Sequence, residues 1–237
     1  MPAIKAPAMA LGGLTPLSTV DFPGGYLAAV LFAQGCPLRC PYCHNPGLQP
    51  WRGRNLIPWY DALRWLQSRR GLLDAVVFSG GEPTAQAPLT AALADVRRLG
   101  FRTALHTAGI YPTRLREVLS LSLVDWVGLD IKAPWHLYDD ITGLPGSGGR
   151  IQQTLDMILT SGVCYELRTT VHLSVVTAAD LLVLARELKR RGVGRWVLQE
   201  FHHQGCPDKH LAATSLPLDA SLLSQLRVLV PEIQVRS

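Results

Sequence analysis

Three of the five cysteines, Cys36, Cys40 and Cys43, lie within eight residues. Thiols this close suit a metal site better than a disulfide framework for a chain of this length. A cluster of four irons ordinarily takes four thiolates, so three leave one iron with an open coordination position. Pro37 and Pro41 keep the segment out of a helix and predict a loop. The spacing therefore favours a loop that holds an iron–sulfur cluster with one open position.

A zinc site is the alternative for the same cysteines. Structural zinc is four-coordinate and closed, so it would need one more ligand besides the three thiolates. His44 follows the third cysteine directly, which is tighter than the usual ligand spacing, and Cys206 lies far downstream. The spacing favours the open cluster, and zinc with either fourth ligand stays an open alternative.

Composition places the chain among ordinary globular proteins. It has 237 residues, of which 48% are hydrophobic and 17% charged, and this is enough for one large domain with a substantial core. No apolar run reaches the ~18 residues of a membrane span. The N-terminal segment lacks the sustained apolar core of a secretory signal. We therefore expect a cytoplasmic protein without a membrane partner.

The formal net charge of +5 does not by itself indicate nucleic acid. The basic residues are scattered, and the short basic clusters at 69–70, 97–98 and 189–191 lie near the ends of predicted helices. Cations there complement the helix dipole. We expect no nucleic-acid partner.

Apolar segments of strand length alternate with helical segments along the chain. Strands are predicted at 26–33, 74–78, 101–106, 124–131, 163–173 and 195–202, and helices at 58–70, 88–100, 112–120, 149–161 and 177–191. Alternating strands and helices imply parallel pairing, and polar residues within the strands favour a curved barrel over an open doubly wound sheet. We predict an α/β fold, a partial (β/α)6 TIM-like barrel with outer helices. Residues 1–237 form one domain, with 1–25 as an N-terminal arm and 203–237 as an extension packed on the outside.

Polar residues gather at one end of these predicted strands. In barrels of this kind the active site lies at the C-terminal ends of the strands. Five of the six predicted strands end at such residues or are followed directly by them. These are the cysteine loop, the turn 80–83, His106-Thr107, Asp130 with Lys132, and His202. In the remaining strand, Glu166, Arg168, Thr170 and His172 share one face, which must point into the barrel. A buried arginine needs a partner or a ligand, so Arg168 is expected on a charged small molecule and Glu166 on a neighbouring strand.

Together these motifs resemble the radical S-adenosylmethionine superfamily. The resemblance rests on the cysteine spacing, on Tyr42 before the last cysteine, and on the turn Gly80-Gly81-Glu82-Pro83. The continuation Cys43-His44-Asn45 and the lead-in 17–24, Leu-Ser-Thr-Val-Asp-Phe-Pro-Gly, are similar to those of the glycyl-radical-enzyme activases. Among these, the activases of anaerobic ribonucleoside-triphosphate reductase are the most similar.

The resemblance implies a [4Fe-4S] cluster on Cys36, Cys40 and Cys43, with S-adenosylmethionine on the open iron. It implies reductive cleavage to a 5′-deoxyadenosyl radical, which takes a hydrogen atom from a glycine of a partner enzyme. The implied partners are a glycyl-radical enzyme, anaerobic ribonucleotide reductase above all, and a reduced electron donor of the flavodoxin or ferredoxin type. Cofactor contacts are implied at Tyr42, Asn45, Gly80, Gly81, Glu82, Thr107, Asp130, Lys132, Arg168 and His202.

One stretch departs from the activase pattern. Activases commonly carry Asp-Thr-Asn-Gly after the third strand, whereas residues 106–109 of this chain are His-Thr-Ala-Gly. A contact or monovalent cation that depends on the missing acid is therefore not carried over. Two rival functions stay open, namely a radical enzyme that acts on a small molecule and a metal-binding or electron-transfer protein without catalysis. Of the two remaining cysteines, Cys164 is expected in the core and Cys206 in a loop near the mouth of the barrel.

Overall fold

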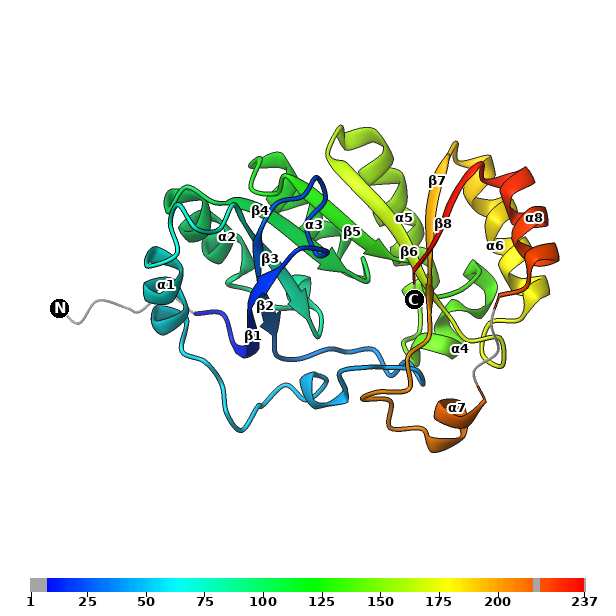
Figure 1. Ribbon diagram of the computed structural model, residues 1–237, viewed down its shortest axis with the longest axis horizontal. Helices are drawn as coiled ribbons and strands as arrows, with labels where there is room; N and C mark the ends of the chain where they lie inside the picture. Colours follow the sequence, from blue (N-terminus) through cyan, green and yellow to red (C-terminus); the bar gives the residue numbers. More distant parts are fainter. Residues whose placement is uncertain (1–7, 215–217, 237) are drawn as a thin grey trace.

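The protein forms one curved sheet of eight strands in chain order, as seen in a computed structural model that describes residues 8–214 and 218–236 (Figure 1). The strands are β1 (Leu11–Ser18), β2 (Ala28–Ala33), β3 (Ala75–Gly80), β4 (Arg102–Thr107), β5 (Trp126–Asp130), β6 (Cys164–Val171), β7 (Arg195–Glu200) and β8 (Glu232–Arg236). β1 is antiparallel to β2, and every later neighbouring pair is parallel. The six predicted strands are confirmed as β2 to β7.

Most of the helices lie along the outer side of this sheet, whereas α7 lies apart from it in the segment that follows β7 (Figure 1). They are α1 (Trp59–Gln67), α2 (Leu89–Arg98), α3 (Pro112–Ser120), α4 (Tyr138–Thr142), α5 (Ser147–Ser161), α6 (Ala178–Arg190), α7 (Lys209–Ala213) and α8 (Ala220–Leu229). Short 3-10 turns occur at η1 (Pro46–Leu48), η2 (Pro83–Ala85) and η3 (Trp135–Leu137). Local signals mark the beginnings of two helices, because Pro112 opens α3 and the side chains of Thr177 and Asp180 form a capping box at α6.

The two faces of the strands bury different clusters. Ala29 and Leu31 of β2 pack with the helices in the large outer core, whereas Ala28 and Val30 join a small inner cluster. That inner cluster also contains Phe22 and residues from the beginnings of β3, β4 and β5. The inner cluster fills the barrel near the N-terminal ends of the strands, so polar side chains have room only near the C-terminal ends.

Both ends of the chain contribute more to the sheet than the sequence predicts. Residues 11–18 form β1 and pair with β2, where only an arm was expected. The C-terminal extension does not simply pack outside, since β8 pairs with β7 as a further parallel strand. Residues 1–7, 215–217 and 237 of these two segments lie outside the described residues.

The sheet is a partial barrel, because its order runs from β1 to β8 and no pairing joins these two strands in the described part of the chain. Cys164 is exposed at the first residue of β6, so its predicted place in the core is wrong. Across residues 8–214 and 218–236, no helix is long and apolar enough to cross a membrane.

Candidate active site

A cavity of about 390 Å³ lies at the C-terminal edge of the sheet. Of the thirteen site residues predicted from the sequence, eleven line it, and Glu82 and His202 do not. The eleven are Cys36, Cys40, Cys43, Tyr42, Asn45, Gly80, Gly81, Thr107, Asp130, Lys132 and Arg168. The fold thus brings together residues from the ends of five strands, β2 to β6.

The cysteine loop is held by backbone contacts and one buried ring. The backbone N–H of Cys36 donates to the carbonyl of Gln49 at 3.0 Å. Tyr42 is buried, and its hydroxyl donates to the carbonyl of Lys132 at 3.3 Å, which ties the loop to the end of β5. The thiols of Cys36, Cys40 and Cys43 are free and line the cavity.

The Gly-Gly-Glu-Pro turn is joined directly to the start of that loop. Gly81 N–H donates to the carbonyl of Ala33, and Glu82 N–H donates to that of Gly35, both at 2.9 Å. A Cβ atom on Gly81 would collide with the carbonyl group of Gly35. Gly80 has a φ of +108°, which only glycine adopts readily. These two positions therefore need glycine so that two motifs can meet.

Glu82 lies beneath the cavity rather than in its wall. Its carboxylate is fully buried and accepts from the hydroxyl of Thr107 at 2.7 Å, from Ala108 N–H at 2.8 Å and from Thr84 N–H at 3.0 Å. Burial raises the pKa of Glu82, although these hydrogen bonds oppose the rise. Glu82 thus joins the turn after β3 to the end of β4, and a direct contact of its carboxylate with the cofactor stays a prediction.

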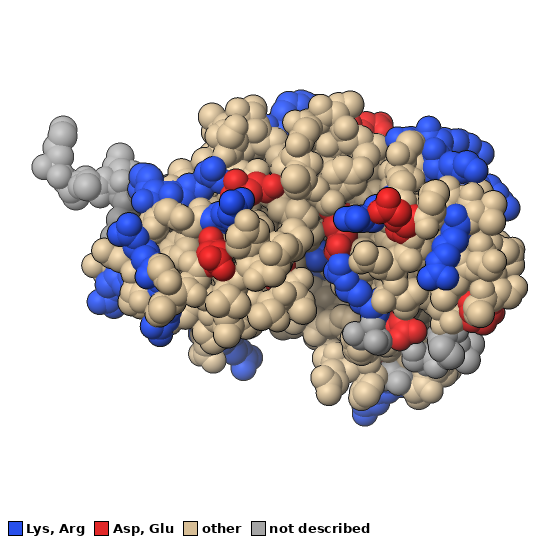
Figure 2. All heavy atoms as spheres, turned by 45° about the horizontal axis from the view of Figure 1, so that its top comes forward, with Lys and Arg blue, Asp and Glu red and all other residues tan. Residues whose placement is uncertain are grey.

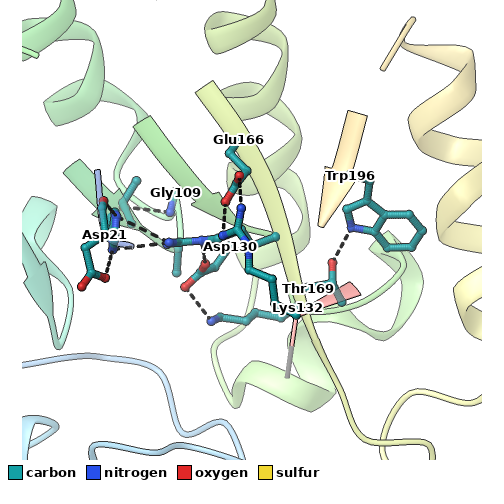
Figure 3. A network of polar contacts seen from close by, with 12 residues as sticks. Asp21, Gly109, Asp130, Lys132, Glu166, Thr169 and Trp196 are labelled. Atoms are coloured by element: carbon teal, nitrogen blue, oxygen red, sulfur yellow. Dashed lines mark hydrogen bonds and ion pairs between the residues drawn. The ribbon is translucent and has the colours of Figure 1, made fainter. Parts of the chain in front are cut away.

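Three charged side chains meet on the cavity wall (Figure 3). Asp130 ends β5 directly opposite Arg168 of β6, and its carboxylate accepts from Arg168 Nε at 3.0 Å and from Lys132 Nζ at 3.2 Å. Burial would raise the pKa of Asp130, but the charges of Lys132 and Arg168 outweigh it and hold the pKa at about 2. Burial would lower the pKa of Lys132, and Asp130 raises it instead. At neutral pH the trio carries one net positive charge, which suits an anionic group of a ligand.

Gly128 has no side chain and so leaves space for the side chains of Arg168 and His106. A Cβ atom there would lie 2.8 Å from Cζ of Arg168 and 3.0 Å from Cδ2 of His106. His106 Nε2 lies 3.0 Å from the carbonyl oxygen of Asp21, which assigns the proton to that nitrogen, and Nδ1 lies 3.4 Å from an Arg168 nitrogen. Burial and the charge of Arg168 lower the pKa of His106 to about 3. The residue that stands where activases carry an acid is therefore a neutral side chain.

Sequence reasoning missed Asp21 and Gln199, which also line the cavity. Asp21 lies between β1 and β2 inside the lead-in segment quoted for the resemblance, so its signal was present but was not read as a site. Thr170 lines the cavity as well, as the alternation along β6 predicted. Gln199 of β7 had no signal in the sequence.

His202 and Cys206 belong to the segment after β7, which lies against the cysteine loop. The exposed His202 has its ring 6.4 Å from that of His44, and Cys206 Sγ lies 3.6 Å from the carbonyl oxygen of Pro41. A Cβ atom on Gly205 would collide with the carbonyl oxygen of His44. The segment therefore packs directly on the loop.

The donor set suits a cluster better than a single ion. Among residues 8–214 and 218–236, no group of three or more His, Cys, Asp or Glu side chains is arranged to hold one metal ion. A cluster presents several irons, so its thiolates need not converge on one point. Burial, together with the charge of Glu82, raises the pKa of Cys36 to about 12, and burial raises that of Cys40. Binding of a cluster must therefore displace protons from these thiols.

Two proteins with similar sequences are named as activating enzymes. A putative glycyl-radical enzyme activating enzyme of Methanocaldococcus jannaschii is 28% identical over 219 residues, which cover 90% of this chain and 88% of that protein. A pyruvate formate-lyase-activating enzyme of Clostridium pasteurianum is 33% identical over 204 residues and covers 80% of each chain.

A solved structure has a similar fold, and a family model matches most of the sequence. The crystal structure of Streptococcus suis SuiB bound to S-adenosylmethionine superposes with a TM-score of 0.64 at 16% identity and covers 86% of this chain. The match covers 48% of SuiB, so this chain spans about half the length of that protein. Residues 30–188 match the Radical SAM superfamily, which uses a [4Fe-4S] cluster and S-adenosylmethionine. Because this match extends over more than half of the sequence, the chain belongs to the radical SAM superfamily.

Proposed function

We propose that the chain is a glycyl-radical-enzyme activating enzyme, and that its partner is anaerobic ribonucleotide reductase. The observation that carries the proposal is that three free thiols and the Asp130, Lys132 and Arg168 trio line the same cavity. The names of the two curated relatives support the activase class. The lead-in segment and the Cys-His-Asn continuation support the same class, and the resemblance of the sequence as a whole to activases of anaerobic ribonucleotide reductase supports the choice of partner.

In this proposal Cys36, Cys40 and Cys43 hold the [4Fe-4S] cluster. When bound, the cluster supplies the electron that splits the sulfonium of S-adenosylmethionine into methionine and a 5′-deoxyadenosyl radical. A donor of the flavodoxin or ferredoxin type delivers that electron. Tyr42 and Asn45 support the cluster from the same loop.

The remaining residues orient S-adenosylmethionine. Lys132 and Arg168 face its carboxylate, because the trio has a net positive charge. Asp130, held ionised by its two cations, accepts from a ribose hydroxyl. The backbone of Gly80 and Gly81 faces the amino group, since no side chain obstructs that approach. Hydrogen abstraction from glycine needs no general base, so the task of the protein is placement and exclusion of water.

The test mixes reconstituted, reduced protein and S-adenosylmethionine with purified anaerobic ribonucleotide reductase. A glycyl radical on the reductase, seen by electron paramagnetic resonance, is the expected result. The absence of a radical with this and other glycyl-radical enzymes, alongside turnover of a metabolite, would support the rival radical enzyme that acts on a small molecule. Stoichiometric zinc, or a cluster whose spectrum does not respond to S-adenosylmethionine, would support the non-catalytic rival.

A further inference from the structure

The hydroxyl of one buried tyrosine holds the backbone behind the charged trio. Tyr138 is the first residue of α4, is fully buried and does not line the cavity. Its hydroxyl donates to the carbonyl of Asp130 and accepts from the N–H of Lys132, both at 3.2 Å. Lys132 lies beyond the last residue of β5, so its N–H is held by this hydroxyl rather than by a neighbouring strand. The turn that carries two of the three charges is therefore fixed by a side chain outside the cavity.

A second tyrosine holds the same turn from the cysteine loop. The hydroxyl of Tyr42 donates to the carbonyl of Lys132 at 3.3 Å. The N–H and the C=O of Lys132 are thus both bonded to tyrosine hydroxyls, one from α4 and one from the loop. Because a buried polar group that loses its partner is costly, these bonds keep the turn and the two tyrosines in one arrangement.

The other end of α4 contacts the cysteine loop directly. The N–H of Arg39, the residue before Cys40, donates to the carbonyl of Thr142 at 2.7 Å. Within the five-residue helix, the hydroxyl of Thr142 donates to the carbonyl of Tyr138, also at 2.7 Å. Helix α4 therefore bonds to both parts of the site, the cysteine loop at Thr142 and the charged turn at Tyr138.

Helix α4 is in turn fixed on α5. The carboxylate of Asp139 accepts from the N–H of Gly146 at 2.6 Å and from that of Gly148 at 2.9 Å, where α5 begins. Helix α5 buries Ile151 and Leu155 in the large outer core. The position of α4 is therefore set by the scaffold rather than by the site itself.

The trio borders a cavity and is supported by protein on one side only. Figure 2 shows the molecule hollowed between its two halves. The side chain of Lys132 is 15% exposed and that of Asp130 is 30% exposed. A binding group displaced by about 1 Å loses much of its effect on a ligand. Because the thiols and the trio line one cavity, a cofactor bound there contacts both of the segments that α4 joins.

We propose that Tyr138 is a positioning residue for S-adenosylmethionine. Its hydroxyl holds the 130–132 turn in the orientation in which Asp130 and Lys132 meet the cofactor, and α4 sets the separation between this turn and the cysteine loop. This inference rests on the contact of the trio with S-adenosylmethionine that belongs to the proposed function, and it is independent of which partner enzyme is activated.

Tyr138→Phe tests the proposal because it keeps the ring and removes only the hydroxyl. Thr103→Val is the matched control. The hydroxyl of the buried Thr103 also donates to a backbone carbonyl, that of Leu123 at 2.7 Å, but at the beginning of β4, the end of the strand away from the cavity. Urea denaturation of the cluster-free proteins, with iron and sulfide analysis after reconstitution, checks that each variant folds and holds its cluster.

The measurement titrates S-adenosylmethionine into the reduced, reconstituted protein and follows the electron paramagnetic resonance spectrum of the cluster. Tyr138→Phe should raise the half-saturating concentration by about tenfold, which corresponds to about 1.4 kcal/mol. Thr103→Val should stay within about twofold of the wild type, and both variants should bind as much iron and sulfide as the wild type. An unchanged half-saturating concentration in Tyr138→Phe, or an equal rise in both variants, would overturn the inference.

Two further variants locate the effect at the turn. Tyr42→Phe removes the other hydroxyl on Lys132 and provides a second test should Tyr138→Phe not fold; it should raise the half-saturating concentration by about threefold, and no rise would overturn the inference. In an Asp130→Asn background, Tyr138→Phe should add less than about twofold, because both changes act on the same turn. A full additional tenfold rise would show that Tyr138 does not act through this turn. A wild-type cluster that responds to S-adenosylmethionine without forming a glycyl radical on any partner would count against the activase proposal alone.

Discussion

Replacing Asp130 by Asn tests whether this carboxylate holds the charged trio together. Asn keeps the volume of the side chain but leaves Lys132 and Arg168 as adjacent cations with no carboxylate between them. A carboxyl group whose pKa falls from 3.8 to about 2 on folding contributes about 2.5 kcal/mol at pH 7. The Asp130 side chain is 30% exposed, so solvent screening reduces this to about 2 kcal/mol.

Urea denaturation of the cluster-free protein measures this loss, and the chain offers a matched control. Arg191 Nε contacts Asp156 at 3.0 Å, the same atom type and distance as in the Arg168–Asp130 pair, but Asp156 is 60% exposed. Asp156→Asn should lower the free energy of unfolding by less than about 0.5 kcal/mol. Equal losses in the two variants would refute the claim that Asp130 contributes to stability by holding the two cations of the trio together.

The stability difference between the wild type and Asp130→Asn should depend on pH. The pKa of Asp130 is depressed on folding, so its contribution is present above the unfolded pKa and is lost as the pH falls. The stability difference between the wild type and Asp130→Asn should therefore shrink between about pH 4 and pH 2. A difference that stays constant through this range would contradict the assigned cause.

Three further variants test other parts of the account by urea denaturation. Glu82→Ala leaves the buried N–H groups of Thr84 and Ala108 without an acceptor, so the free energy of unfolding should fall by about 3–5 kcal/mol. A fall of less than about 1 kcal/mol would contradict the role of Glu82 as their acceptor. The pKa of His106 is lowered on folding to about 3, so the unfolded state binds a proton near pH 6 that the folded state does not. The free energy of unfolding of the wild type should therefore fall by about 2 kcal/mol relative to that of His106→Phe between about pH 6.5 and pH 5. Parallel pH profiles of the two proteins would argue against a neutral His106. Thr177→Ala removes the capping box of α6 and should cost about 1 kcal/mol, whereas no change would mean that the cap is not formed in solution.

The strand and helix repeats were predictable because local signals mark them. Apolar runs of strand length alternate with helices that prolines open and glycines close. The pairing of β1 and β8 with the sheet was not predicted, since β1 contains two glycines and a proline and β8 is only five residues long. Edge strands of this kind are defined by their pairing partners rather than by their own composition.

The site was predictable to the level of the sheet edge, but not to the direction of each side chain. Position after a strand identified Asp130 and the Gly-Gly-Glu-Pro turn. It could not show that the Glu82 side chain points away from the cavity, because that direction depends on two hydrogen-bond donors at the end of β4, the Thr107 hydroxyl and the Ala108 N–H. Asp21 escaped notice because it reaches the site through the antiparallel β1, which the sequence did not reveal.

The most direct measurement of the central claim follows the hydrogen atom. Anaerobic ribonucleotide reductase labelled with glycine deuterated at the α-carbon is mixed with the reconstituted enzyme, reductant and S-adenosylmethionine. The proposed function predicts a glycyl radical on the reductase and 5′-deoxyadenosine that carries one deuterium atom, with neither product from the Cys40→Ala variant. Unlabelled 5′-deoxyadenosine without a glycyl radical, or the same products from Cys40→Ala, would contradict it.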